Sequence, residues 1–128
     1  MTVVDRRTSC ILAWAVAPHR DATTLQRLVD DAPQADFYYS DLYATYRQLI
    51  YTPGRHTPVP GKSETYRVEG DNAEMRHYLA RLARRSRCFS RCIHALRRAI
   101  RLFVYLWNAR QLYRQRYPSY PSHLIEFV

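Results

Sequence analysis

The sequence contains almost no lysine, so its basic charge comes nearly entirely from arginine. Of the 20 basic residues only Lys62 is a lysine, and 11 acidic residues leave a formal net charge of +9. Arginine presents a planar fork of donors that bonds phosphate oxygens in pairs, which a lysine-rich solvating surface does not do. A GC-rich genome would also favour arginine over lysine, so this preference is only weak support for phosphate binding.

Long apolar runs are absent as well. No run reaches the roughly 18 residues of a membrane span, and no basic start followed by an apolar run forms a signal peptide. The three cysteines, Cys10, Cys88 and Cys92, make no secreted disulfide pattern. Cys88-x-x-x-Cys92 with His94 lacks a convincing fourth zinc ligand. We therefore expect reduced thiols in a cytoplasmic protein with no membrane partner.

What the sequence does contain is the composition of one globular domain with an uneven charge. Its 128 residues are 47% hydrophobic and 13% aromatic, with eleven tyrosines. Residues 1–61 hold six basic and six acidic residues, whereas residues 62–116 hold fourteen basic residues and four acidic ones. A basic charge confined to one segment is expected of a surface that binds phosphates.

The hydrophobic pattern predicts an α/β first half and a helical second half. The expected elements are a strand over 1–4, a turn over 5–8, a buried strand over 10–16, a helix over 21–32, a strand over 37–40, a short helix or turn over 43–50, an irregular connection or short strand over 55–63, a helix over 68–84, a helix over 91–113 and an extended tail from 117. The first two strands should form a hairpin.

The predicted last helix carries an apolar stripe. Its members are Ile93, Leu96, Ile100, Phe103, Val104 and Trp107. Helical spacing favours core packing for this stripe. A partner-binding helical module is the weaker alternative, and it predicts assembly that is insensitive to salt.

One acidic residue directly follows a predicted strand and another begins a predicted helix, and both positions suggest chemistry. Asp41 follows a strand, and ligands of open α/β sheets gather at the carboxyl ends of strands. Glu69 begins a helix, near Asp71 and Glu74, that then becomes rich in arginine. Carboxylates beside a basic face suit metal-assisted chemistry on a polyanion. A solvated helix with ordinary capping acids is the alternative.

Several specific motifs accompany these acids. They are Tyr38-Tyr-Ser-Asp41, Tyr46, Gly61-Lys62, Thr65, Glu69 with Asn72, Arg76, and the run Leu82-Ala-Arg-Arg-Ser-Arg-Cys-Phe-Ser-Arg91. Together they resemble the catalytic domain of insertion-sequence-1 family transposases. The resemblance runs from about Val4 to Val128 and is strongest over residues 61–91.

The resemblance implies a ribonuclease-H-like mixed sheet with long C-terminal helices. It also implies an Asp-Asp-Glu triad that holds two Mg²⁺ (or Mn²⁺) ions, in an enzyme that cuts and joins DNA ends. Asp41 matches the second acid and Glu69 the third. The positions implied to contact DNA are Lys62, Asn72, Arg76, Arg84, Arg85, Arg87 and Arg91.

The sequence departs from the family pattern at its start. The family's first acid lies on a strand upstream of the hairpin, and Asp5 falls in the turn, far from the strand ends. We therefore expect residues 1–128 to be one partial catalytic domain with its first strand missing, which does not transpose alone. Such a chain would be a marginal, aggregation-prone monomer.

The expected partners are DNA, at the transposon ends and the target, and a second copy or an upstream-encoded transposase segment. The expected location is the nucleoid. The alternative function is a non-catalytic, basic DNA-binding remnant or a regulator of transposition, which would bind phosphates without needing Asp41 or Glu69.

Overall fold

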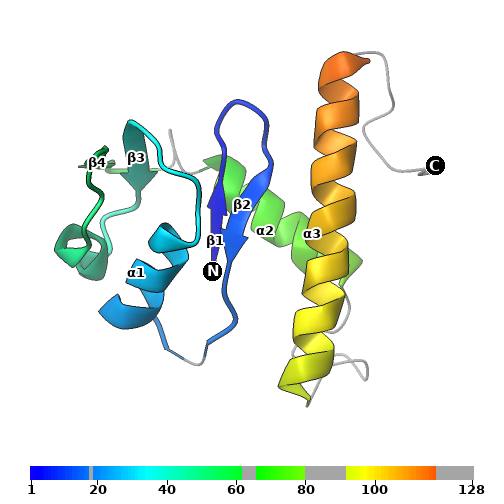
Figure 1. The fold of residues 1–128 in the computed structure, drawn as a ribbon, viewed down its shortest axis with the longest axis horizontal. Helices are drawn as coiled ribbons and strands as arrows, with labels where there is room; N and C mark the ends of the chain where they lie inside the picture. Colours follow the sequence, from blue (N-terminus) through cyan, green and yellow to red (C-terminus); the bar gives the residue numbers. More distant parts are fainter. Residues whose placement is uncertain (18, 62–65, 80–91, 118–128) are drawn as a thin grey trace. The chain divides into compact units, whose positions relative to one another are not determined.

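The computed structural model describes residues 1–17, 19–61, 66–79 and 92–117, which form a mixed α/β structure. The elements in chain order are β1 (Thr2–Val4), β2 (Ile11–Trp14), α1 (Ala22–Asp30), β3 (Phe37–Ser40), the 3-10 helix η1 (Ala44–Gln48), β4 (Arg55–Pro58), α2 (Tyr66–Tyr78) and α3 (Ile93–Arg116) (Figure 1). They belong to two compact units. The first comprises residues 1–4 and 12–70, and the second comprises residues 5–11 and the described residues from 71 onward.

The four strands form two separate pairs. β1 pairs with β2, and β3 pairs with β4. We expected one mixed sheet, but the described strands form two separate two-stranded sheets with no hydrogen-bonded strand pair between them. The first pair is an antiparallel hairpin, because Met1 and Ala15 exchange backbone hydrogen bonds of 3.0 and 2.9 Å.

Helix α1 supplies the core of the first unit. Asp21 is its N-cap and accepts a 2.6 Å hydrogen bond from the Thr24 amide. Leu25 and Leu28 on this helix are buried. Leu28 clusters with small and medium apolar residues of the hairpin and of the segment after α1, namely Met1, Val3, Ala13, Ala15 and Ala32. The hairpin therefore packs one face against α1.

Strands β3 and β4 form a parallel pair in the same unit. Phe37 lies opposite Arg55, and Ser40 lies opposite Pro58. The pairing extends past the strand ends, because the Val59 amide donates to the Ser40 carbonyl over 3.0 Å. Parallel strands need a crossover of about a dozen residues. Residues 41–54, with η1 inside them, form that crossover.

In the second unit, residues 5–11 attach to the middle of α3. The Asn108 side-chain amide bonds both backbone groups of Ile11, accepting from the nitrogen over 2.7 Å and donating to the oxygen over 2.8 Å. The Trp107 indole donates to the Ser9 carbonyl over 3.0 Å. Asn108 thus satisfies backbone groups of Ile11 in the way that a neighbouring strand would.

The two long helices differ from their predicted bounds. Helix α2 begins at Tyr66, two residues before its predicted start, and ends at Tyr78, although neither glycine nor proline marks that end; residues 80–84 of the predicted helix lie outside the described residues. Helix α3 begins two residues later than predicted and ends three residues later. Its stripe is buried at Leu96, Ile100 and Trp107, as predicted, but Ile93 is 42% exposed. None of the described helices is long and apolar enough to cross a membrane.

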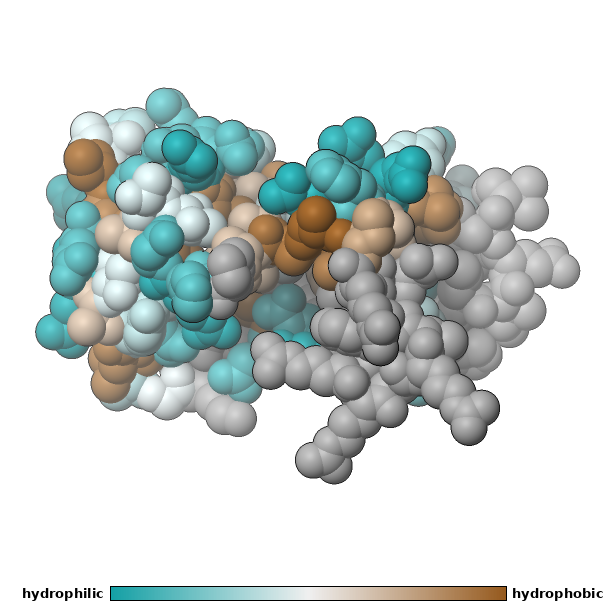
Figure 2. All heavy atoms as spheres, turned by 90° about the horizontal axis from the view of Figure 1, so that it is seen from below, coloured by the Kyte–Doolittle hydropathy of each residue, from teal (hydrophilic) through white to brown (hydrophobic). Residues whose placement is uncertain are grey.

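The buried face of α3 also includes two polar residues that the pattern missed, Arg110 and Gln111. The Arg110 guanidinium lies 5.6 Å from the centre of the Trp107 ring. In this position the guanidinium cation lies against an aromatic face. The attraction between them offsets part of the free energy that burial of the cation costs. Several large apolar side chains are exposed instead, among them Phe37, Ile50, Leu102 and Tyr105, and Figure 2 shows apolar residues on the surface beside hydrophilic ones. Aggregation of the monomer stays a prediction.

Two glycines allow a matched test of packing. A Cβ added to Gly54 would lie 2.2 Å from the Ala35 carbonyl oxygen and 2.6 Å from Cε2 of Tyr38. We expect Gly54→Ala to lower the free energy of unfolding by about 1–3 kcal/mol. At Gly70, within α2, no atom lies within 4 Å of such a Cβ. Gly70→Ala should therefore raise the free energy of unfolding by about 0.8–1 kcal/mol. Urea denaturation of both variants checks this, and equal effects would contradict the close approach at Gly54.

Candidate active site

Asp41 lies where the sequence predicted it, as the first residue after β3. Its side chain is exposed, and Oδ1 accepts a 3.0 Å hydrogen bond from the Tyr43 amide. This Asx-turn directs the chain from the strand into η1. No hydrogen bond to the other oxygen, Oδ2, is seen from the described residues. One carboxylate oxygen is therefore held, and the described residues leave the other available for a further contact.

Two tyrosines stand near this turn. Partial burial, together with the charge of the Asp41 carboxylate, raises the pKa of Tyr46 above its ordinary value of 10.0. Burial, with smaller electrostatic contributions from Tyr46 and Tyr38, raises the pKa of Tyr51 to about 12. The Tyr51 hydroxyl donates to the Tyr46 carbonyl over 2.9 Å. Both phenols therefore stay protonated at neutral pH. Tyr46, one of the motif residues, therefore interacts electrostatically with the Asp41 carboxylate.

The end of β3 also makes a side-chain contact with β4. The Ser40 hydroxyl lies 2.8 Å from His56 Nε2 and 2.8 Å from the Asp41 carbonyl oxygen. The His56 ring stacks on Tyr51 with centroids 4.4 Å apart and planes at 12°. Burial, with a smaller contribution from the positive Arg47, lowers the pKa of His56 below 6.5. His56 is therefore neutral at physiological pH.

Helix α2 carries the second predicted acid. Glu69 lies in its first turn, as predicted, and is exposed. Asn72 and Arg76 follow at positions three and seven residues later, on the same side of the helix. Asn72 is half-buried and Arg76 is exposed. Asp41 and Glu69 both belong to the first compact unit. The remaining residues predicted to contact DNA lie outside the described residues: Lys62, Arg84, Arg85, Arg87 and Arg91.

The described residues alone do not fit a metal centre. Within them, no group of three or more His, Cys, Asp or Glu side chains lies close enough to hold an ion. Asp41 on its own has the chemistry of a hard-cation ligand, since its carboxylate is exposed with one oxygen open. A complete site would need ligands beyond those that the described residues bring together.

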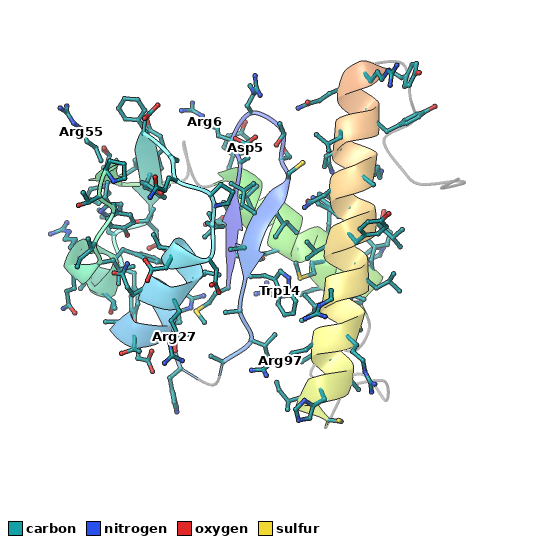
Figure 3. All side chains as sticks on the ribbon, viewed as in Figure 1. Asp5, Arg6, Trp14, Arg27, Arg55 and Arg97 are labelled. Carbon is teal, nitrogen blue, oxygen red and sulfur yellow. The ribbon has the colours of Figure 1, made fainter. Side chains whose placement is uncertain are left out.

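Asp5 lies in the hairpin loop, as predicted, and its carboxylate is bonded within that loop (Figure 3). Oδ1 accepts from the Arg7 amide over 3.3 Å, and Oδ2 accepts from the Thr8 amide over 3.1 Å and from the Thr8 hydroxyl. Partial burial raises the pKa of Asp5, but the hydrogen bonds from Thr8 and Arg7 outweigh it and hold the pKa below 3.8. Asp5 therefore stabilises its own turn.

The lowered pKa of Asp5 gives a pH-dependent prediction. The unfolded chain binds a proton at this carboxyl more tightly than the folded chain does, so protonation favours unfolding. The stabilisation is complete above the unfolded value of 3.8 and is lost as pH falls through the folded value. We expect Asp5→Ala to cost about 1 kcal/mol of unfolding free energy at pH 7. In urea titrations the difference from wild type should shrink below pH 3.8; a constant difference down to pH 2.5 would contradict this.

Sequence reasoning did not identify Ser40 and His56 as a pair, nor Asn108 as a backbone partner of Ile11. In the sequence, Ser40 stands out only as part of the Tyr38-Tyr-Ser-Asp41 motif, and the scattered position of His56 predicts a surface or edge residue. A signal did exist for the pair. Both residues fall on predicted or possible strands that flank one crossover, and a parallel register could have placed them near each other.

Comparison with known proteins adds the family. Residues 1–110 match the profile of a protein family described as IS1 transposase. No curated protein and no solved structure matches the chain. Membership of such a family suggests a role in transposition and implies DNA as a partner, and transposases of the Asp-Asp-Glu class generally use divalent metal ions. Because the match covers most of its residues, the chain belongs to the IS1 transposase family.

Proposed function

We propose that this chain contributes Asp41 and Glu69, the second and third acids of an Asp-Asp-Glu centre, to the ribonuclease-H-like catalytic domain of a DNA transposase. One observation carries this proposal beyond family membership. Asp41 lies directly after a strand of a parallel pair, held through Oδ1 and open at Oδ2. The carboxyl end of such a strand is where α/β proteins collect their ligands.

The reaction that this centre would serve is phosphoryl transfer between DNA strands. An attacking hydroxyl and a leaving oxygen must be held in line, and charge develops on the oxygens around the phosphorus. Bound Mg²⁺ or Mn²⁺ would stabilise that charge. This chain would contribute the carboxylate of Asp41, at a strand end, and that of Glu69, in the first turn of a helix.

The DNA would lie along the basic segment. Arg76 is exposed on the same side of α2 as Glu69, and Asn72 lies between them along the helix. Lys62, Arg84, Arg85, Arg87 and Arg91 complete the proposed contacts. Arginine forks there would bind phosphate oxygens and offset the repulsion between DNA and the two acids.

The test replaces both acids by their neutral isosteres. We expect the double variant Asp41→Asn, Glu69→Gln to lose Mn²⁺ binding, measured by the electron paramagnetic resonance signal of free Mn²⁺. Its affinity for DNA without metal should stay within about threefold of wild type or rise slightly, since two repulsive charges are removed.

A matched control removes two other exposed acids, through Asp36→Asn with Glu74→Gln. This control carries the same charge change, so it should keep the wild-type affinity for Mn²⁺. If both double variants and the wild type bind Mn²⁺ and DNA equally, the catalytic assignment falls. The non-catalytic DNA-binding protein or regulator would then be the better description.

A further inference from the structure

The end of β3 contains a chain of hydrogen bonds that reaches Asp41 from β4. His56 Nε2 lies 2.8 Å from the Ser40 hydroxyl oxygen, which lies 2.8 Å from the Asp41 carbonyl oxygen. Oδ1 of Asp41 then accepts from the Tyr43 amide over 3.0 Å. Two consecutive contacts therefore connect the ring of a histidine on β4 to the main-chain carbonyl of Asp41, and a third contact holds the carboxylate of the same residue.

The direction of the protons in this chain follows from counting donors. A serine hydroxyl has one proton, and the Asp41 carbonyl can only accept. The Ser40 proton must therefore go to that carbonyl if the 2.8 Å contact is a hydrogen bond. The proton between Ser40 and His56 must then come from Nε2. This makes His56 the donor and fixes its neutral form as the Nε2–H tautomer, with Nδ1 bare.

The surroundings of His56 hold its ring in place for this contact. The ring stacks on Tyr51 at 4.4 Å, and the Tyr51 ring in turn lies 5.0 Å from that of Tyr38. Tyr38 is the Cα partner of His56 across the parallel pair. Stacking fixes the plane of the His56 ring, and strand pairing fixes the position of its Cα. The ring can therefore direct Nε2 toward Ser40 at a small cost in side-chain entropy.

We propose that His56 and Ser40 are positioning residues for Asp41: the Nε2–H of His56 orients the Ser40 hydroxyl, which holds the Asp41 carbonyl and so fixes the direction of its carboxylate. The value of this arrangement to catalysis rests on the proposed function of Asp41. A carboxylate that is oriented before its ligands arrive need not be ordered during the reaction.

The first test needs no variant. In the full chain at pH 8, long-range ¹H–¹⁵N correlation spectra report which ring nitrogen of each histidine carries the proton. We expect His56 to be in the Nε2–H form. A predominant Nδ1–H form would overturn the proposal, because His56 would then accept the Ser40 proton and leave the Asp41 carbonyl without it.

The second test uses two matched pairs of variants and the exchange of the Tyr43 amide with water, since that amide bonds Oδ1 of Asp41. His56→Phe keeps a ring that can stack on Tyr51 but has no donor, whereas His56→Gln keeps a donor and removes the ring. Ser40→Ala lacks the hydroxyl, and Ser40→Thr retains it. We expect exchange to accelerate roughly three- to tenfold in the Phe and Ala variants. The Gln and Thr variants should stay within about twofold of wild type, given the usual strength of such a bond.

Rescue by the donor-bearing variants distinguishes positioning from simple packing. If exchange in His56→Phe equals wild type while His56→Gln is faster, ring packing alone matters and the proposal is overturned. The Ser40 pair keeps the test valid should a His56 variant not fold. Should the tautomer and exchange results hold while Asp41→Asn, Glu69→Gln leaves Mn²⁺ binding intact, positioning stands and the proposed function fails.

Discussion

The affinity of the chain for double-stranded DNA should fall by roughly 10²- to 10³-fold between 50 and 200 mM NaCl, as expected for about four to five phosphate contacts. The reason is the charge of residues 62–116, which hold fourteen basic residues and four acidic ones, while the first 61 residues are balanced. Each phosphate that is neutralised releases counterions, so the logarithm of the association constant falls linearly with the logarithm of salt. Fluorescence anisotropy with labelled DNA over a salt series measures the slope.

Two triple variants locate these phosphate-binding residues. Replacing Arg84, Arg85 and Arg87 by glutamine should lower the magnitude of the salt slope by about 0.9 for each phosphate that is no longer neutralised. The matched control replaces Arg27, Arg47 and Arg55, which are exposed in the balanced first half (Arg27 and Arg55 are labelled in Figure 3). It removes the same charge and should leave the slope nearly unchanged. Equal slopes in both triple variants would show a diffuse charge effect, and a salt-insensitive association would favour the partner-binding helix instead.

The largest loss of stability is expected for Trp107→Ala, at about 3–5 kcal/mol of unfolding free energy. Trp107 is 6% exposed, and its indole donates to the Ser9 carbonyl over 3.0 Å. Phe103 stacks on its ring with centroids 5.7 Å apart, and the Arg110 guanidinium lies against it. The substitution leaves a cavity, an unpaired carbonyl and a buried guanidinium without its aromatic neighbour. Urea denaturation followed by circular dichroism measures the effect.

Two companion variants separate these causes. Trp107→Phe keeps most of the ring and removes the indole donor, so it should cost only about 1–2 kcal/mol. Tyr105→Ala truncates an aromatic residue that is 71% exposed on the same helix, and it should change the free energy by about 0.5 kcal/mol or less. If Tyr105→Ala were as costly as Trp107→Ala, the burial of α3 described above would be wrong. Because Trp107→Phe should fold, the test remains decisive even if the alanine variant does not.

Local features were readable before the structure. The bounds of β3 agree with the expected strand over 37–40, and Asp21 caps α1, because strand periodicity and capping chemistry act over a few neighbouring residues. Asp41 was expected after a strand and Glu69 at a helix start for the same reason, and both lie there. Their catalytic and metal-binding roles stay predictions.

Other features could not be read from neighbouring residues. The end of α2 at Tyr78 carries no breaking residue, and Arg110 and Gln111 are polar yet buried. Helical periodicity assigns residues to a face, but it does not say how far a neighbouring segment covers that face. The burial of Arg110 depends on the position of Trp107 and on the packing around that part of α3. This burial is therefore a property of the folded chain and not of the local sequence.

The sequence by itself determined the local elements, the confinement of basic charge to residues 62–116, the positions of Asp41 and Glu69 relative to their elements, and the motifs that indicate the family. Only the tertiary structure decided that Asn108 bonds Ile11 across 97 residues of sequence and that His56 reaches Ser40 across the β3–β4 pair. It also decided that the strands form two pairs. The physical reason is that capping, periodicity and charge are set by adjacent residues, whereas these contacts depend on register and packing between segments that the chain brings together only when it folds.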